Sequence, residues 1–106
     1  MTFWIAENLD LENGILTSKL PVLIFATATW DNPGKLMRVA IDKIEKKYDY
    51  KIVVCIMDID NAADMANKLG INTVPTVRIF KDGVKVTEFD GNKSEAFLSK
   101  AIEKIL

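Results

Sequence analysis

Two short stretches of the chain, residues 22–26 and residues 52–57, are apolar at every position. Runs of this length without polar residues are typical of strands buried on both faces of a sheet. The second run lies within a predicted strand over residues 51–58, and a shorter candidate strand covers residues 2–5. The pattern therefore indicates two strands in the interior of a sheet.

Near the end of the chain, Asp82-Gly83 separates two further strand-like segments, residues 76–81 and residues 84–89. An Asp-Gly pair between such segments is a strong signal for the tight turn of a β-hairpin. We therefore expect these two strands to add an antiparallel edge to the sheet.

Apolar residues recur at helical spacing between the predicted strands. We expect helices over residues 33–48, 61–69 and 93–105, and a weaker helix over residues 8–18, which Gly14 interrupts. The apolar stripes of the three stronger helices consist of Leu36, Met37, Ala40, Ile41, Ile44 and Tyr48, then Ala62, Met65, Ala66 and Leu69, then Phe97, Leu98, Ala101, Ile102 and Ile105.

The start of the helix over residues 33–48 has a clear local signal. Pro33 suits a first helical position, where its missing N–H group costs nothing, and Asp31 or Asn32 can cap the helix. Gly70 is expected to close the helix over residues 61–69.

The predicted elements follow the order β-α-β-α-β-α-β-β-α. Alternating strands and helices favour parallel strands joined by right-handed crossovers, and the hairpin adds antiparallel pairing. The expected fold class is therefore α/β, a central mixed sheet with helices on both faces. The 106 residues are expected to form one domain, residues 1–106.

Composition excludes several classes of function. A net charge of −1 gives no electrostatic reason to expect nucleic acid or an anionic membrane as a partner. No apolar run approaches the ~20 residues of a spanning helix, and the N-terminal sequence lacks the features of a secretory signal. A cytoplasmic location is the default expectation. With one cysteine and no histidine, we expect no intrachain disulfide, no ordinary zinc site and no cofactor.

The order of elements resembles the thioredoxin family along nearly the whole chain. The matching marks are residues 21–25, Trp30, Pro33, Lys35, residues 58–60, residues 70–76, residues 80–83 and Gly91. The most specific of them is Gly-Ile-Asn-Thr-Val-Pro-Thr at 70–76. The resemblance identifies Pro75 with the family's cis-proline, and it implies that Val74 presents unpaired backbone groups to an extended peptide.

The resemblance also shows what this chain lacks. Trp30 to Lys35 reads Trp-Asp-Asn-Pro-Gly-Lys, where a thioredoxin carries Trp-Cys-Gly-Pro-Cys-Lys. Asp31 replaces the attacking cysteine and Gly34 the resolving one, and neither can exchange disulfides. We expect Asp31 either to cap the helix or to form an anionic contact with a partner.

Two further family positions have become apolar. The buried acid of thioredoxins corresponds to Phe25, and the lysine that accompanies it corresponds to Ile56. Replacing a buried charged pair by packed apolar groups is often neutral or stabilising. Cys55 lies within an apolar run without a neighbouring Lys or Arg, so we expect an inert core residue.

These observations predict a redox-inactive protein that is not an enzyme and binds or regulates other proteins through the former active-site groove. The expected partner is a protein or an extended peptide segment. The expected binding residues are Trp30, Asp31, Asn32, Pro33, Thr73, Val74, Pro75, Gly91 and Asn92. Trp30 packing against the helix is the open alternative for that residue. The alternative functions are a structural subunit of an assembly and a thiol–disulfide oxidoreductase of an unconventional type.

Overall fold

The computed structural model of the protein describes residues 2–5 and 18–106, and in this part of the chain five strands form one sheet. The strands are β1 (Thr2–Ile5), β2 (Val22–Thr27), β3 (Val53–Asp58), β4 (Thr76–Lys81) and β5 (Val84–Asp90). The helices are α1 (Asn32–Lys47), α2 (Ala63–Lys68) and α3 (Glu95–Glu103). The helix expected over residues 8–18 lies, but for its last residue, outside the described residues.

The sheet is mixed, and its strands follow the order β1-β3-β2-β4-β5. Strand β3 pairs in parallel with both β1 and β2, whereas β4 pairs antiparallel with β2 and with β5. This arrangement confirms the predicted parallel first half and the antiparallel hairpin. Asp82 and Gly83 both adopt positive φ angles, 54° and 79°, as the tight turn of a hairpin requires.

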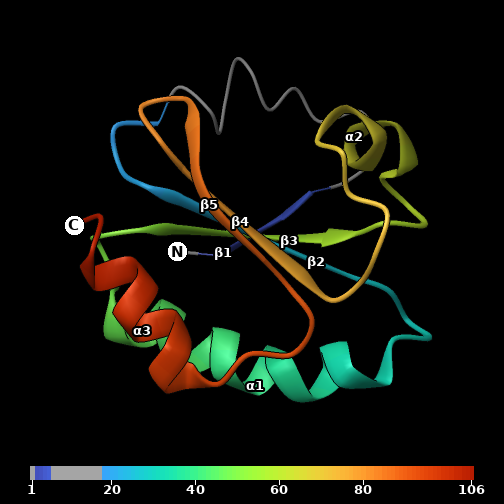
Figure 1. The fold of residues 1–106 in the computed structure, drawn as a ribbon, viewed down its shortest axis with the longest axis horizontal. Helices are drawn as coiled ribbons and strands as arrows, with labels where there is room; N and C mark the ends of the chain where they lie inside the picture. The colour runs from blue at the N-terminus through green and yellow to red at the C-terminus, as the bar shows by residue number, and fades with distance from the viewer. Residues whose placement is uncertain (1, 6–17) are drawn as a thin grey trace.

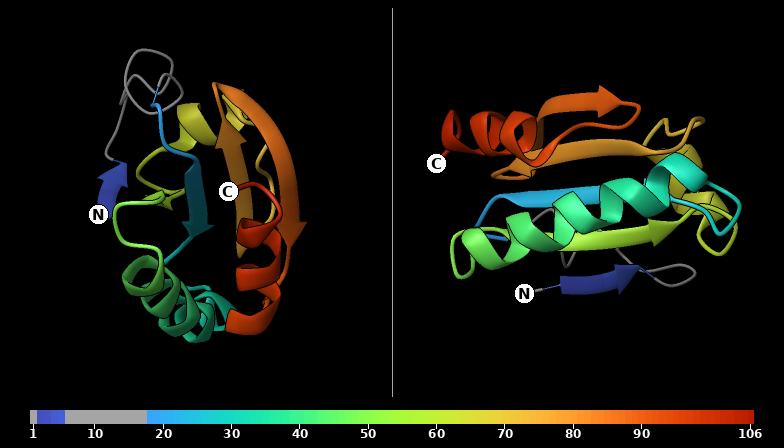
Figure 2. Two further views of the ribbon diagram at one scale, coloured as in Figure 1. Left: turned by 90° about the vertical axis from the view of Figure 1, so that its left-hand side faces the viewer. Right: turned by 90° about the horizontal axis from the view of Figure 1, so that it is seen from below.

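Helices cover both faces of the sheet, as Figure 1 and Figure 2 show. On one face, α1 and α3 pack over one hydrophobic cluster. On the other face, α2 covers a second cluster. Because the side chains of β2 and β3 alternate between the two clusters, the apolar runs have no polar side. The predicted α/β fold with a central mixed sheet is therefore confirmed.

Helix α1 begins as the sequence predicts and buries a narrower stripe than predicted. Asp31 is its N-cap, and Pro33 lies in its first turn. Met37, Ile41 and Ile44 are buried, whereas the side chain of Leu36 is 70% exposed. The prediction for Leu36 is wrong because this residue lies beside the stripe, on a side of α1 that no described element covers.

The other helices are shorter than their apolar patterns. Helix α3 begins after Ser94, whose hydroxyl accepts the N–H of Phe97 at 3.1 Å, and it buries Leu98 and Ile102. Phe97 is 42% exposed, although its ring lies edge-on against Phe89 with centroids 4.8 Å apart. Capping therefore sets where this helix starts, two residues after its predicted first residue.

Candidate functional site

The candidate site lies at one end of the sheet, where several loops converge. Strand β4 begins beside the end of β2, because Thr76 is paired with Ala26. Strand β5 ends beside the beginning of β4, because Asp90 is paired with Thr76. The turn after β2, the loop before β4 and the residues after β5 therefore meet at this end, and the N–H of Gly91 donates to the carbonyl of Pro75 at 2.8 Å.

Asp31 is directed into the protein. It is 4% exposed. Its Oδ1 accepts the N–H of Gly34 at 3.0 Å, and its Oδ2 accepts the hydroxyl of Thr27 at 3.0 Å. Of the two roles expected for Asp31, this geometry is that of the helix cap. A carboxylate held in this way is not presented to a partner.

Gly34 has no room for a side chain next to Asp31. A Cβ atom built on Gly34 would collide with Oδ2 of Asp31 and with Oγ1 of Thr27. The two positions that hold cysteines in the family motif are therefore coupled in this chain. The carboxylate at one fills the space that a side chain at the other would need.

The apolar replacements Phe25 and Ile56 lie side by side on the neighbouring strands β2 and β3. They are paired in the register of β2 and β3, and both side chains are fully buried. Both belong to the cluster beneath α1 and α3. At the two positions where thioredoxins carry a charged pair, this protein therefore has two neighbouring apolar side chains in its core.

Trp30 lies at the surface and is fixed by a residue that the sequence analysis did not assign. Its side chain is 63% exposed, and its Nε1–H donates to Oδ2 of Asp60 at 2.9 Å. The backbone N–H of Asp60 in turn donates to Oδ1 of Asp58 at 2.9 Å. The only signal for Asp60 was its place in the Asp-Ile-Asp match to the family.

The loop before β4 leaves a stretch of backbone unpaired. The Val74–Pro75 peptide bond is cis. Val74 is half-buried against the cluster beneath α2, and no backbone hydrogen bond joins it to another described residue. An extended segment can pair with backbone groups of this kind. The other predicted binding residues lie nearby at the surface, with the exception of half-buried Gly91: Asn32, Pro33, Thr73 and Asn92.

Cys55 is not available for chemistry in the folded protein. Its side chain is fully buried in β3. Burial raises the pKa of the thiol from 9.0 to about 12, because a thiolate would be desolvated there. The expectation of an inert core cysteine is confirmed by this placement.

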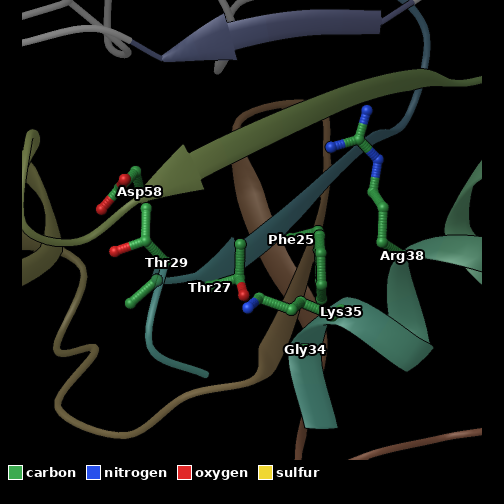
Figure 3. Close-up of a pocket in the computed structure, with 8 residues that line it drawn as sticks. Phe25, Thr27, Thr29, Gly34, Lys35, Arg38 and Asp58 are labelled. Carbon is green, nitrogen blue, oxygen red and sulfur yellow. The ribbon is translucent and has the colours of Figure 1, made fainter. Parts of the chain in front are cut away.

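A cavity of about 290 Å³ opens beside the first turn of α1. Figure 3 shows Lys35 extending from α1 toward Thr27, and Asp58 at the end of β3. The residues that line the cavity are Phe25, Thr27, Ala28, Thr29, Gly34, Lys35, Arg38 and Asp58. No local sequence pattern marks this cavity, because its walls come from three separate elements.

Comparison with known proteins places the chain in a family. The sequence model of the family described as Thioredoxin matches residues 3–104. The chain belongs to the thioredoxin family. It is 33% identical to a thioredoxin of Synechocystis sp. over 100 residues, which cover 94% of each protein. It is 31% identical over 105 residues to the mitochondrial thioredoxin of Bos taurus, of whose length it spans 63%.

A solved structure supports the same fold. One chain of a structure concerned with thiol resolution in a yeast mitochondrial 1-Cys peroxiredoxin through the glutathione and thioredoxin systems superposes with a TM-score of 0.86. The superposition covers 97% of this chain and 94% of the other, at 23% sequence identity. At this identity the likeness concerns the fold alone. In the described part of the chain, no helix is long and apolar enough to cross a membrane.

These comparisons correct the function predicted from the sequence. We expected a redox-inactive binding or regulatory module, with a structural subunit as one alternative. The relatives that match nearly the whole chain are named thioredoxins, and that family implies an oxidoreductase. The prediction rested on the two missing sulfur atoms, and the family of the relatives contradicts it.

Proposed function

We propose that this chain promotes thiol–disulfide exchange, the chemistry implied by its family, as an oxidoreductase of an unconventional type. It binds an extended, disulfide-bearing segment of another protein at Val74 and Trp30. The attacking thiol comes from a second molecule, because the one cysteine of the chain is buried in β3. The contribution of the protein is to hold and orient the segment.

The chemical step balances without a sulfur atom from this chain. The thiolate of the second molecule attacks one sulfur of the bound disulfide, and a new S–S bond forms as the old one breaks. The displaced sulfur leaves as a thiolate and takes a proton from water. The products are a mixed disulfide and a free thiol on the segment. In this scheme the chain itself carries out no covalent step.

The observation that carries the proposal is the unpaired backbone of Val74. A segment that pairs with Val74 is held extended, as in the addition of a strand to a sheet edge. Trp30 presents most of its indole at the same end of the sheet, and its hydrogen bond to Asp60 limits the rotation of the ring. An aromatic ring also makes favourable contacts with sulfur atoms.

The test measures the reduction of a disulfide-bearing, extended peptide by glutathione, with and without the protein. The protein is expected to increase the rate in a manner that saturates with peptide. Trp30→Ala and Val74→Asp are expected to lose the increase together with peptide binding, as followed by amide chemical shifts. Tyr50→Ala is the matched control, since Tyr50 is 86% exposed and lies beyond the far end of α1.

Two results would contradict the proposal. One is binding of the peptide at Val74 with no change in the rate of its reduction. The other is a rate increase that survives both Trp30→Ala and Val74→Asp.

The proposal also includes a cytoplasmic location for the protein and the expectation that it does not bind nucleic acid. The net charge of −1 supports the second point. Relatives that the chain matches include proteins named mitochondrial and chloroplastic. Determining where the protein lies in the cells of its native source tests the cytoplasmic location.

A further inference from the structure

The cavity beside α1 has the build of a small ligand site. It lies outside the carboxyl ends of the parallel strands β2 and β3, the position at which α/β sheets commonly bind ligands. Its lining includes two apolar residues, Phe25 and Ala28. Its volume of about 290 Å³ lies at the lower end of the range for ligand pockets, which favours a small molecule over a nucleotide.

One wall of the cavity carries a cation that the fold does not use. Lys35 projects from α1, and within the described residues its ammonium group makes no ion pair or hydrogen bond that would neutralise it. Arg38, one turn further along α1, adds positive charge to the same wall, and its Nε–H donates to Asp42 at 2.9 Å. This wall is therefore suited to an anionic group.

The opposite side of the cavity determines where an anion can lie. Asp58 is a lining residue there, and its Oδ1 accepts the N–H of Asp60 at 2.9 Å. Its negative charge repels an anion toward Lys35. Thr29 is exposed at the rim, and its hydroxyl is able to donate to an anionic oxygen. The hydroxyl of Thr27 already donates to Asp31 and turns only its lone pairs to the cavity.

We propose that this cavity binds a small organic carboxylate with an apolar body. The carboxylate is held by Lys35 and Thr29, and the apolar body covers Phe25. A ligand that also carries an ammonium group gains a second contact with Asp58. This inference is independent of the peptide site at Val74 and stands on the cavity alone.

The experiment titrates the protein with hydrocinnamate, its neutral amide hydrocinnamide, and phenylalanine, and follows amide chemical shifts. We expect hydrocinnamate to shift the signals of residues 27–29 and 34–38. The amide is expected to bind at least about ten-fold more weakly, since it lacks the charge-assisted hydrogen bond. Phenylalanine distinguishes a zwitterion from a simple acid, because only the zwitterion reaches Asp58.

Two lysine variants separate this site from general attraction of an anion to a basic surface. Lys35→Gln is expected to weaken hydrocinnamate binding by about ten-fold. Lys43→Gln, on the same helix, is expected to leave it unchanged; the Lys43 ammonium lies 4.0 Å from Glu95, away from the cavity. Both side chains are exposed, so both variants are expected to fold.

Four outcomes would overturn the inference. They are equal binding of the acid and the amide, equal effects of the two lysine variants, shifts confined to residues outside the cavity, and no shift with any of the three probes. The first shows that the charge is not recognised. The second and third place the acid elsewhere on the surface.

Discussion

The carboxylate of Asp31 occupies the space that a side chain at Gly34 would fill. Asp31 reaches this place because it caps α1 through the N–H of Gly34, at 3.0 Å, and accepts the hydroxyl of Thr27 from the other side. A Cβ atom on Gly34 would collide with Oδ2 of Asp31 and Oγ1 of Thr27, the two atoms of the second hydrogen bond. The three residues therefore form one interlocked group at the start of the helix.

The first prediction concerns this group. Replacing glycine by alanine within a helix ordinarily stabilises a protein by about 0.5–1 kcal/mol. Gly34→Ala is expected instead to destabilise this one by about 2 kcal/mol, because the added methyl group displaces Asp31. Urea unfolding of Gly34→Ala, Asp31→Ala and the double variant measures the coupling. We expect the double variant to be more stable than the sum of the single effects predicts, by about 1 kcal/mol or more. A stabilising Gly34→Ala in the native background would contradict the collision.

The second prediction compares two helix caps. Asp31 and Ser94 both accept a backbone N–H in the first turn of their helices, at 3.0 Å and 3.1 Å. Ser94→Ala is expected to lower the free energy of unfolding by about 1 kcal/mol, the usual value for a cap. Asp31→Ala is expected to lower it by more, about 2 kcal/mol, because it also leaves the hydroxyl of Thr27 without its acceptor. Equal losses would show that the bond to Thr27 adds nothing.

The third prediction concerns the pH dependence of stability that Cys55 brings. In the unfolded chain this thiol ionises near pH 9, whereas burial raises its pKa in the folded protein to about 12. Between these values the unfolded state releases the proton and the folded state keeps it, so stability falls as the pH rises. The slope from this group is about 1.4 kcal/mol per pH unit.

The control for this prediction is Cys55→Ala. The difference in unfolding free energy between the native protein and this variant isolates the thiol from the other groups that titrate above pH 9. We expect that difference to change between pH 9 and pH 11, and to be constant below pH 8. A thiol that reacts with a disulfide reagent as fast in the native protein as in urea would contradict the burial of Cys55.

The fourth prediction concerns Asp90, next to the predicted site. The hydroxyl of Thr76 donates to Oδ1 of Asp90 at 2.6 Å, and this bond, followed by the one from Arg78, lowers the pKa of the carboxyl below 3.8. The stabilising contribution is present above pH 4 and is lost as the pH falls through the lowered pKa. Thr76→Val is expected to raise the titration midpoint of Asp90, as measured by carboxyl carbon shifts. Thr87→Val, on the adjacent strand β5, is the control and is expected to leave the midpoint in place.

The sequence predicted most of the fold because the signals are local. The apolar runs, the Asp82-Gly83 turn and the cap at Asp31 each act within a few residues, and each has the predicted place in the structure. Leu36 was misplaced because helical spacing gives the direction of a stripe and not its width. The width depends on which neighbouring element covers the helix, and that is a tertiary property.

The site was predictable only in part, for a similar reason. Residues of the turn after β2 and of the loop before β4 were expected together through the family resemblance, and the strand register brings these loops together. The bond between Trp30 and Asp60 joins residues thirty positions apart, and the cavity beside α1 lies between three elements. Neither feature leaves a periodic trace in the sequence.

The pairing of Phe25 with Ile56 affects how readily this protein could regain the buried charged pair of thioredoxins. Restoring cysteines at positions 31 and 34 would return sulfur atoms to the start of α1, and it would leave the apolar core beneath them unchanged. Phe25→Asp alone, or Ile56→Lys alone, would strand an uncompensated charge among hydrocarbon side chains, at a cost of several kcal/mol. The charged pair could therefore return only through one of these destabilised single variants or by changing both residues at once, so the apolar pair opposes a return to the charged pair.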